Sequence, residues 1–303
     1  MLAFVHKDPQ KKRAPEGSLF ASTRESSIIM NSSARFHDWK GVGPLSLKVA
    51  LKGEAMYEVE HRRLTVDEHR LLILNDAQEY RVLVNSPFKA ETFIVFFDAT
   101  LVADVLQHFQ RSDERLLDNP ANPLSSDYTF NLNTLDLDDG LRQRLAQLKQ
   151  SIAQNAPMLS LREDLFFLFH ALRATEARAS SHALTLPFAK TSTQQEIARR
   201  LLVARDYLHA YKSEAIGLEE LSDAAMLSPN HLLRNFCVYF GCTPFQYLTR
   251  LRMKTAEQLL QYSALPITEI CQVAGFESLS SFSWSFKKIT GRSPRRFRMD
   301  HLQ

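Results

Sequence analysis

Cationic and small polar side chains crowd the stretch from Gly275 to Arg298, near the end of the chain. Phe282 and Phe286 recur at helical spacing within it, and the pattern stops at Gly291. A short helix that is apolar on one side and small, polar or cationic on the other suits a DNA groove, because lysine and arginine bind phosphate. The residues expected at the DNA backbone are Ser228, Ser278, Lys287, Lys288, Arg292, Arg295 and Arg296.

The charge of the chain is unevenly distributed. Between residues 230 and 299 there are ten lysines and arginines against three glutamates, a local charge of +7. The whole chain carries +3, so the remaining residues sum to about −4. One region therefore carries the positive field that a polyanion partner requires.

The same region contains an internal repeat. The first copy begins at Leu218 and the second at Ile267, and matching residues lie 49 apart before a turn and 50 apart after it. In each copy the spacing predicts a helix, a tight turn and a second helix. The second helices start after the capping residues Ser228 and Ser278, and each ends at a glycine. A helix-turn-helix unit of this kind presents its second helix to the major groove.

A single helix is predicted between the two copies, from Pro244 to Gln261. It would be roughly 17 residues or ~25 Å long. Successive major-groove segments on one face of DNA lie ~34 Å apart. A rigid spacer of this length would let one chain place both second helices in adjacent segments of the groove.

About a dozen positions between Gln194 and Arg298 follow a known pattern at fixed spacing, namely residues 245–260, Gly275, Phe276, Phe282, Phe286, Gly291, Pro294 and Phe297. They resemble the DNA-binding domain of the AraC/XylS family of bacterial transcription regulators. The resemblance implies seven helices with two helix-turn-helix units, a double-stranded DNA partner, contact with RNA polymerase, and activation of transcription. It also implies a regulatory domain, often N-terminal and cupin-like, that binds an effector and can dimerise.

Carried over position by position, the resemblance implies that base edges are read by Asn230, Leu233, Arg234, Leu279, Ser280, Ser281, Ser283 and Trp284. Leu233, Leu279 and Trp284 depart from the family pattern, in which polar or basic residues are frequent. Leucines could touch thymine methyl groups, or the readout could rest on DNA shape. Arg234 is either a guanine reader or a phosphate contact, and Trp284 either meets DNA or packs at the domain surface.

Residues 25–98 alternate with the period of strands, and turn signals separate the runs. The predicted fold class is α+β: an N-terminal antiparallel β-barrel or sandwich, cupin-like by the resemblance, is followed by helices and then by an all-α C-terminal domain. The expected boundaries are 1–179 for the sensing or dimerisation domain, 180–193 for a linker and 194–303 for the DNA-binding domain.

The N-terminal domain has several candidate roles. An apolar stripe within 141–155 either packs against its own barrel or forms a homodimer surface. A small-molecule effector would lie inside the barrel, with Tyr57, Tyr80 and Arg81 as polar anchors. The alternative is a purely structural dimerisation domain.

A different class of function is a metal-dependent cupin enzyme fused to a DNA-binding module. That chemistry needs clustered ligands, whereas His37, His61 and His69 are isolated along the chain. We therefore expect neither an enzyme, nor a metal, nor a cofactor. A further alternative is a nucleoid-type protein that binds DNA without site preference. With three cysteines and no apolar run of spanning length, the protein is expected to be cytoplasmic, without a membrane partner.

Overall fold

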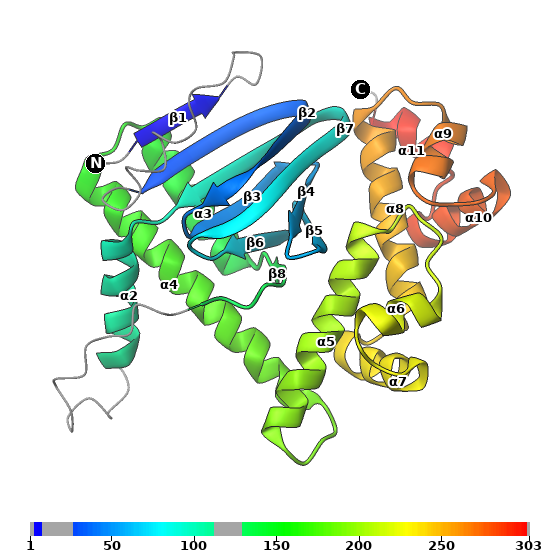
Figure 1. The fold of residues 1–303 in the computed structure, drawn as a ribbon. Helices are drawn as coiled ribbons and strands as arrows, with labels where there is room; N and C mark the ends of the chain where they lie inside the picture. The colour runs from blue at the N-terminus through cyan, green and yellow to red at the C-terminus, as the bar shows by residue number, and fades with distance from the viewer. Residues whose placement is uncertain (1–2, 8–26, 112–128, 302–303) are drawn as a thin grey trace. The chain divides into compact units, whose positions relative to one another are not determined.

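The computed structural model describes residues 3–7, 27–111 and 129–301, which divide into two compact units (Figure 1). The N-terminal unit extends to Ser180, and the C-terminal unit comprises the chain from Ser181 together with the short segments Arg63–Thr65 and Asn85–Lys89. Apart from these two segments the sheet lies in the first unit, and the second is built from helices. This layout confirms the predicted α+β class.

The sheet of the N-terminal unit closes into a barrel through one long strand. Its strands are β1 (Ala3–Lys7), β2 (Ile28–Gly43), β3 (Ser46–Lys52), β4 (Glu54–Val59), β5 (Arg62–Asp67), β6 (Arg70–Leu74), β7 (Gln78–Phe96) and β8 (Leu135–Asp136). Their order is β1-β2-β7-β3-β6-β5-β4, with β8 on β6. The first part of β7 pairs with β4 and its last part with β3, so the path from β7 through β3, β6, β5 and β4 closes on itself. The pair β1–β2 is parallel, unlike the antiparallel pairs around β3, β6 and β7.

Strand β3 shows how the sequence divides between the two faces of this barrel. Leu47 and Val49 belong to the hydrophobic core that includes residues of the helices that follow the sheet. Because neighbouring side chains on a strand point to opposite faces, Lys48 lies on the other face, inside the barrel. The apolar half of this strand therefore packs against helices, and its polar half faces the interior.

In the described part of the N-terminal unit the helices are α2 (Ala99–Arg111), α3 (Asp139–Ala153) and α4 (Met158–His182). The predicted stripe on α3 is buried in the core shared with the sheet, since Leu141, Leu145 and Leu148 are at most 4% exposed. Of the two readings of this stripe, the structure favours packing against its own barrel. A dimer through 141–155 would have to use the polar outer face of α3.

The C-terminal unit contains a short 3-10 helix η3 (Ala183–Thr185) and seven α-helices, which fit the number implied by the resemblance. These are α5 (Thr191–Ala210), α6 (Leu218–Ala224), α7 (Pro229–Phe240), α8 (Pro244–Tyr262), α9 (Ile267–Val273), α10 (Leu279–Thr290) and α11 (Pro294–His301). One apolar core joins α5, α6, α7 and the start of α8, and a second joins the rest of α8 to α9, α10 and α11. Most of the stretch expected as a linker is structured, because Ala183 and Leu186 are buried in the first core.

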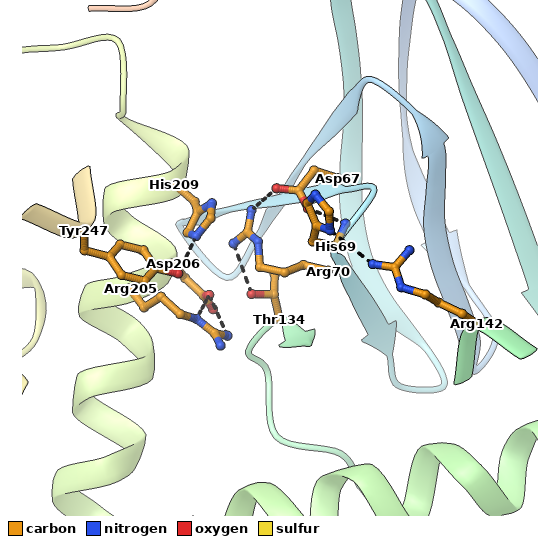
Figure 2. Close-up of polar contacts among 9 residues, drawn as sticks. All are labelled: Asp67, His69, Arg70, Thr134, Arg142, Arg205, Asp206, His209 and Tyr247. Carbon is orange, nitrogen blue, oxygen red and sulfur yellow. Dashed lines mark hydrogen bonds and ion pairs between the residues drawn. The ribbon is translucent and has the colours of Figure 1, made fainter. Parts of the chain in front are cut away.

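Buried polar contacts fix the turns and helix pairs within each unit (Figure 2). In the N-terminal unit, Arg70 at the start of β6 forms an ion pair with Asp67 at 3.0 Å and a 3.4 Å hydrogen bond to Thr134. In the C-terminal unit, the ring Nε2 of His209 on α5 lies 3.0 Å from the hydroxyl of Tyr247 on α8. The ion pair closes the turn before β6, whereas the contacts of Arg70 with Thr134 and of His209 with Tyr247 join segments that are distant in sequence.

All three cysteines are free thiols. Cys242 and Cys271 are buried, whereas Cys237 is half-buried. Burial raises the pKa of the Cys271 thiol, which keeps it protonated and unreactive near neutral pH.

Candidate nucleic-acid interface

The first helix-turn-helix unit consists of α6 and α7. Its turn passes through Met226, which adopts a left-handed φ of +52° and is 60% exposed. Helix α7 begins with Pro229 at its first position, after Ser228 as N-cap. The Ser228 hydroxyl makes no capping hydrogen bond, so it is an exposed donor at the start of the helix. Gly241 ends the helix in a left-handed conformation, as the repeat predicts.

The second unit consists of α9 and α10. Its turn passes through Gly275 at φ +82°, the position that Met226 occupies in the first unit. Here the hydroxyl of Ser278 caps α10 by accepting a 3.2 Å hydrogen bond from the backbone N–H of Ser281. Gly291 ends α10 in the left-handed region. Both predicted units are therefore present.

Helix α8 connects the two units as one uninterrupted element of 19 residues. At 1.5 Å per residue it is ~28 Å long. Thr243 and Gln246 form a capping box at its start, with hydrogen bonds of 3.2 and 3.0 Å. Met253, Ala256 and Leu259 are buried against the second helix-turn-helix unit. Helix α8 is therefore a packed part of the domain and not a flexible linker.

The outer face of α7 is polar. Asn230, His231 and Arg234 are exposed, and Leu233 is half-buried. The opposite face of the helix is held by Leu232 and Phe236, which are fully buried in the first apolar core. Three of the predicted readers, Asn230, Leu233 and Arg234, therefore lie together on the side of α7 that faces away from the core.

The outer face of α10, formed by Leu279, Ser280, Ser283, Trp284 and Lys287, is less polar than that of α7. Trp284 is 66% exposed and Leu279 is 43% exposed. Ser280 is exposed and Ser283 is half-buried between its neighbours.

Predicted residue Ser281 lies beside that face. It is exposed, and its backbone N–H is already used by the Ser278 cap. Lys288 lies one turn after Trp284, and its ammonium group is 4.8 Å from the centre of the indole ring. This cation–π contact limits the orientations of both side chains.

The cationic residues predicted at the DNA backbone fall into two groups. Lys287, Lys288 and Arg295 are exposed and form no ion pair with another described residue. Arg292 and Arg296 both bind Asp300 on α11, at 2.7 and 3.3 Å. Their guanidinium groups remain more than half exposed, so this shared carboxylate orients them without removing them from the surface.

Two other arginines of this region have structural contacts. Arg252 on α8 donates 2.7 Å hydrogen bonds to the backbone carbonyls of Lys212 and Glu214, after the end of α5. Arg298 donates a 2.6 Å hydrogen bond to the carbonyl of Leu265. The partners of both arginines are therefore backbone carbonyl groups. Unpaired carbonyls near a helix end accept such donors readily.

The candidate effector anchors lie on different faces of the barrel. Tyr57 and Tyr80 are buried inside it, with ring centres 6.1 Å apart. Burial raises the pKa of both phenols, so both stay protonated. Arg81 follows Tyr80 on β7 and points outward, where it binds Asp38 at 2.6 Å and Glu58 at 3.4 Å. Arg81 and the two tyrosines therefore do not line one space.

The sequence reasoning did not single out Lys48, which the structure places beside Tyr80. Its Nζ donates a 3.0 Å hydrogen bond to the Tyr80 hydroxyl and lies 4.7 and 4.5 Å from the ring centres of Tyr80 and Phe96. Burial lowers the pKa of Lys48 to about 7. Only the alternation along β3, which places Lys48 opposite Leu47 and Val49, could have indicated it.

Two features of the described residues bear on the other classes of function. No three or more His, Cys, Asp and Glu side chains in these ranges gather as they would around a metal ion. Among the described helices, none combines the length and the apolar character needed to cross a membrane.

Comparison with known proteins finds similarity over part of the chain. Residues 221–300 match the family described as a helix-turn-helix domain. Over 141 residues the chain is 30% identical to the probable transcriptional regulator LumQ from Photobacterium leiognathi, covering 42% of this chain and 57% of that protein. Over 162 residues it is 30% identical to the HTH-type transcriptional activator RhaS from Escherichia coli O9:H4 (strain HS), covering 52% of this chain and 53% of that protein.

The chain thus spans about half the length of the curated relatives it matches. Among solved structures, it is similar to a transcriptional regulator with an AraC-type DNA-binding domain from Chromobacterium violaceum. That likeness has a TM-score of 0.34 at 27% identity, and covers 38% of this chain and 98% of the other.

Proposed function

We propose, from the AraC-family helix-turn-helix domain that residues 221–300 form, that this chain is a transcription regulator that binds specific sequences of double-stranded DNA. The observation that carries the proposal is the pair of helix-turn-helix units in one compact unit, joined by α8. Helices α7 and α10 each keep an apolar side in a core and leave the other side exposed. This is the arrangement in which a second helix enters the major groove.

In this proposal the residues divide by role. Base edges are read by Asn230, Leu233, Arg234, Leu279, Ser280, Ser281, Ser283 and Trp284. Phosphates are bound by Ser228, Ser278, Lys287, Lys288, Arg292, Arg295 and Arg296, since most hydrogen bonds to DNA go to the backbone. Ser228 and Lys287 are well suited to that role, because both are exposed and neither side chain has a hydrogen-bond or ion-pair partner among the described residues.

The N-terminal barrel would control this DNA-binding unit. An effector would be recognised from inside the barrel, where Lys48, Tyr57 and Tyr80 provide polar atoms among apolar side chains. A homodimer and contact with RNA polymerase, leading to activation, belong to the same proposal. The name of RhaS, a transcriptional activator, supports the activating direction.

Selection of bound sequences from random duplexes tests the proposal. Full-length protein is incubated with the library near physiological salt, and the bound duplexes are amplified and sequenced over several rounds. The expected result is a bipartite motif whose two parts lie about one DNA turn apart. Retention of duplexes without enrichment of any motif would identify instead a protein that binds DNA without site preference.

A further inference from the structure

The two second helices present different chemistry at equivalent positions. The 50-residue offset that aligns Leu232 with Phe282 and Phe236 with Phe286 also aligns Arg234 with Trp284. The first of these is a cation with five N–H donors, and the second is a large apolar ring. Both are exposed, so the position reaches the surface in each helix. The two helices therefore cannot read bases in the same way.

Trp284 leaves most of its indole in water. At 66% exposure it is the most exposed tryptophan or phenylalanine of the described C-terminal unit, and it lies outside the apolar core that buries Phe282 and Phe286. Exposing so large an apolar side chain opposes folding, and such side chains often mark contact surfaces. Its location on the outer face of α10 indicates what it contacts, because under the proposed function that face meets the major groove.

Leu279 extends this apolar character across the face. With 3.6 residues per turn, Ser283, Lys287 and Ser280 lie between Leu279 and Trp284 around the circumference of α10, and Lys287 lies one turn beyond Ser283 along the axis. Within the axial span from Leu279 to Trp284, the residues between these two apolar side chains are therefore the two short hydroxyl side chains. Neither leucine nor a tryptophan ring face can form the paired hydrogen bonds by which arginine recognises guanine or asparagine recognises adenine. The indole N–H is the one donor among these two flanking groups.

The apolar group that the major groove offers is the C5-methyl group of thymine. We propose that α10 reads its half of the DNA site mainly through such methyl groups, with Leu279 and Trp284 as the residues that contact them, whereas α7 reads its half through hydrogen bonds. This inference rests on the proposed function and specifies its ligand: a duplex with methylated pyrimidines under α10. Ser280 and Ser283 are short enough to let the two larger side chains approach the bases.

Lys288 supports the geometry of this surface. Its ammonium group lies 4.8 Å from the centre of the Trp284 ring, one helical turn further along. The contact holds the indole against the helix and places a cation at the edge of the apolar patch, where the phosphates adjoin the methyl groups. Lys288 acts here as a positioning residue for Trp284.

Uracil substitution tests the inference, because deoxyuridine pairs as thymidine does and lacks only the methyl group. The duplex selected with the full-length protein is resynthesised with uracil at single thymine positions, and dissociation constants are measured by fluorescence anisotropy. We expect the affinity to fall by ~4-fold for each contacted methyl group removed under α10. Uracil under α7 should have less effect, because the exposed readers there, Asn230 and Arg234, form hydrogen bonds, and the apolar reader Leu233 is half-buried.

Two protein variants and one further base make the test specific. Trp284→Ala should bind the thymine duplex more weakly and should no longer distinguish it from the uracil duplex at the affected position. Leu279→Ala should do the same at a different position. When a contacted thymine is replaced by 5-methylcytosine, more binding should survive than with cytosine, because the methyl group is retained.

Arg234 occupies in α7 the position that Trp284 occupies in α10, so replacing Trp284 by arginine gives a matched variant. Trp284→Arg should abolish the uracil effect and create a preference for guanine under α10, as Arg234 is expected to show under α7. If a duplex in which uracil replaces every thymine under α10 bound the protein as tightly as the thymine duplex does, that result would overturn the inference and leave the proposed function intact. Failure to select any motif would instead refute the proposed function itself.

Discussion

At the scale of single residues, Lys48 is the least expected feature of the barrel. It is fully buried on β3, and no carboxylate lies within ion-pair distance among its described contacts. Burial lowers its pKa to about 7, because a charged ammonium group loses its hydration inside the barrel. In the unfolded chain the pKa returns to about 10.5. Folding is therefore coupled to the loss of a proton from this group.

The sign of the resulting pH dependence follows from the two pKa values. Between pH 7 and pH 10.5 the unfolded chain binds the Lys48 proton and the folded chain does not, so stability rises with pH across this window. Below pH 7 both states bind the proton, and the charge is buried at full cost. We expect Lys48→Met to be more stable than the natural chain at pH 6, and the difference to narrow as the pH rises to 9.

Urea unfolding at pH 6, 7.5 and 9 measures this difference. The chain has two tryptophans, so a Trp284→Phe background leaves Trp39, on the barrel, as the fluorescence reporter. Lys149→Met on α3 is the matched control, since Lys149 is exposed and should leave the pH profile unchanged. An identical pH dependence in Lys48→Met and the natural chain would contradict the assignment.

Arg234 and Lys287 are expected to differ in what they contribute to DNA binding. Arg234→Ala should lower the discrimination at one base position by ~1–3 kcal/mol, because a paired contact to guanine is lost. Lys287→Ala should weaken binding to all duplexes alike and reduce the slope of log K against log salt by about one. Titrations against the selected duplex and single-base variants, at several salt concentrations, separate the two effects. Equal weakening of every sequence by Arg234→Ala would assign it to phosphate.

At the scale of elements, the turn of the second helix-turn-helix unit depends on the absence of a side chain at Gly275. A Cβ there would lie 2.7 Å from the carbonyl oxygen of Lys212 and 2.9 Å from Arg252 Nε. Its φ of +82° is also unfavourable for any residue with a Cβ. The first unit tolerates Met226 at the same position of the turn, at a φ of +52°.

Gly275→Ala is therefore expected to destabilise the C-terminal unit by more than backbone strain alone. Strain from the left-handed conformation should cost ~1–2 kcal/mol, and the contact with the Lys212 backbone a further ~1–3 kcal/mol. Gly291→Ala isolates the first contribution, because its φ is +75° and nothing lies within 4 Å of the added Cβ. Urea unfolding in a Trp39→Phe background, with Trp284 as reporter, compares the two. Equal losses would show that the close approach is absent.

Sequence patterns predicted helices and strands well where the hydrophobic period was regular. They predicted them poorly where tertiary contacts determine the bounds of an element. The helices of the repeat were predictable because their apolar spacing, capping residues and terminal glycines agree. Residues Asn85–Pro87 are of types frequent in turns, yet strand β7 continues through them, between the part that pairs with β4 and the part that pairs with β3. Those pairings join distant segments and leave no local signal.

The residues of the candidate interface show the same limit. The helical period predicted that Asn230 and Trp284 face outward, and the structure shows both exposed. The sequence pattern did not reveal that Arg292 and Arg296 share Asp300, or that Arg252 binds carbonyl groups. Long flexible side chains choose partners in three dimensions, and the sequence alone does not reveal which partner is near.

At the scale of the whole molecule, the chain combines a barrel unit with a helical unit that carries the positive charge. This division was predictable because the change from period two to helical spacing, and from acidic to basic composition, extends over many residues. Residues 221–300 of the helical unit match the family described as a helix-turn-helix domain, in agreement with the two units that the repeat predicts. The effector of the barrel remains a proposal, because a binding site is made by side chains from several strands at once.

Because one chain carries both readers, the spacing of the two half-sites on DNA should be strictly limited. Helix α8 is continuous and packed into the domain, so the distance between α7 and α10 is fixed within the C-terminal unit. Five added base pairs would turn the second half-site to the opposite face of the duplex. Ten would restore the face but move the half-site ~34 Å further away. We expect both insertions to lower the affinity of full-length protein by ~100-fold or more, because the second contact is lost. Anisotropy titrations with the three duplexes decide the matter: full affinity for the ten-base-pair insertion would mean that two chains, or a flexible connection, place the readers.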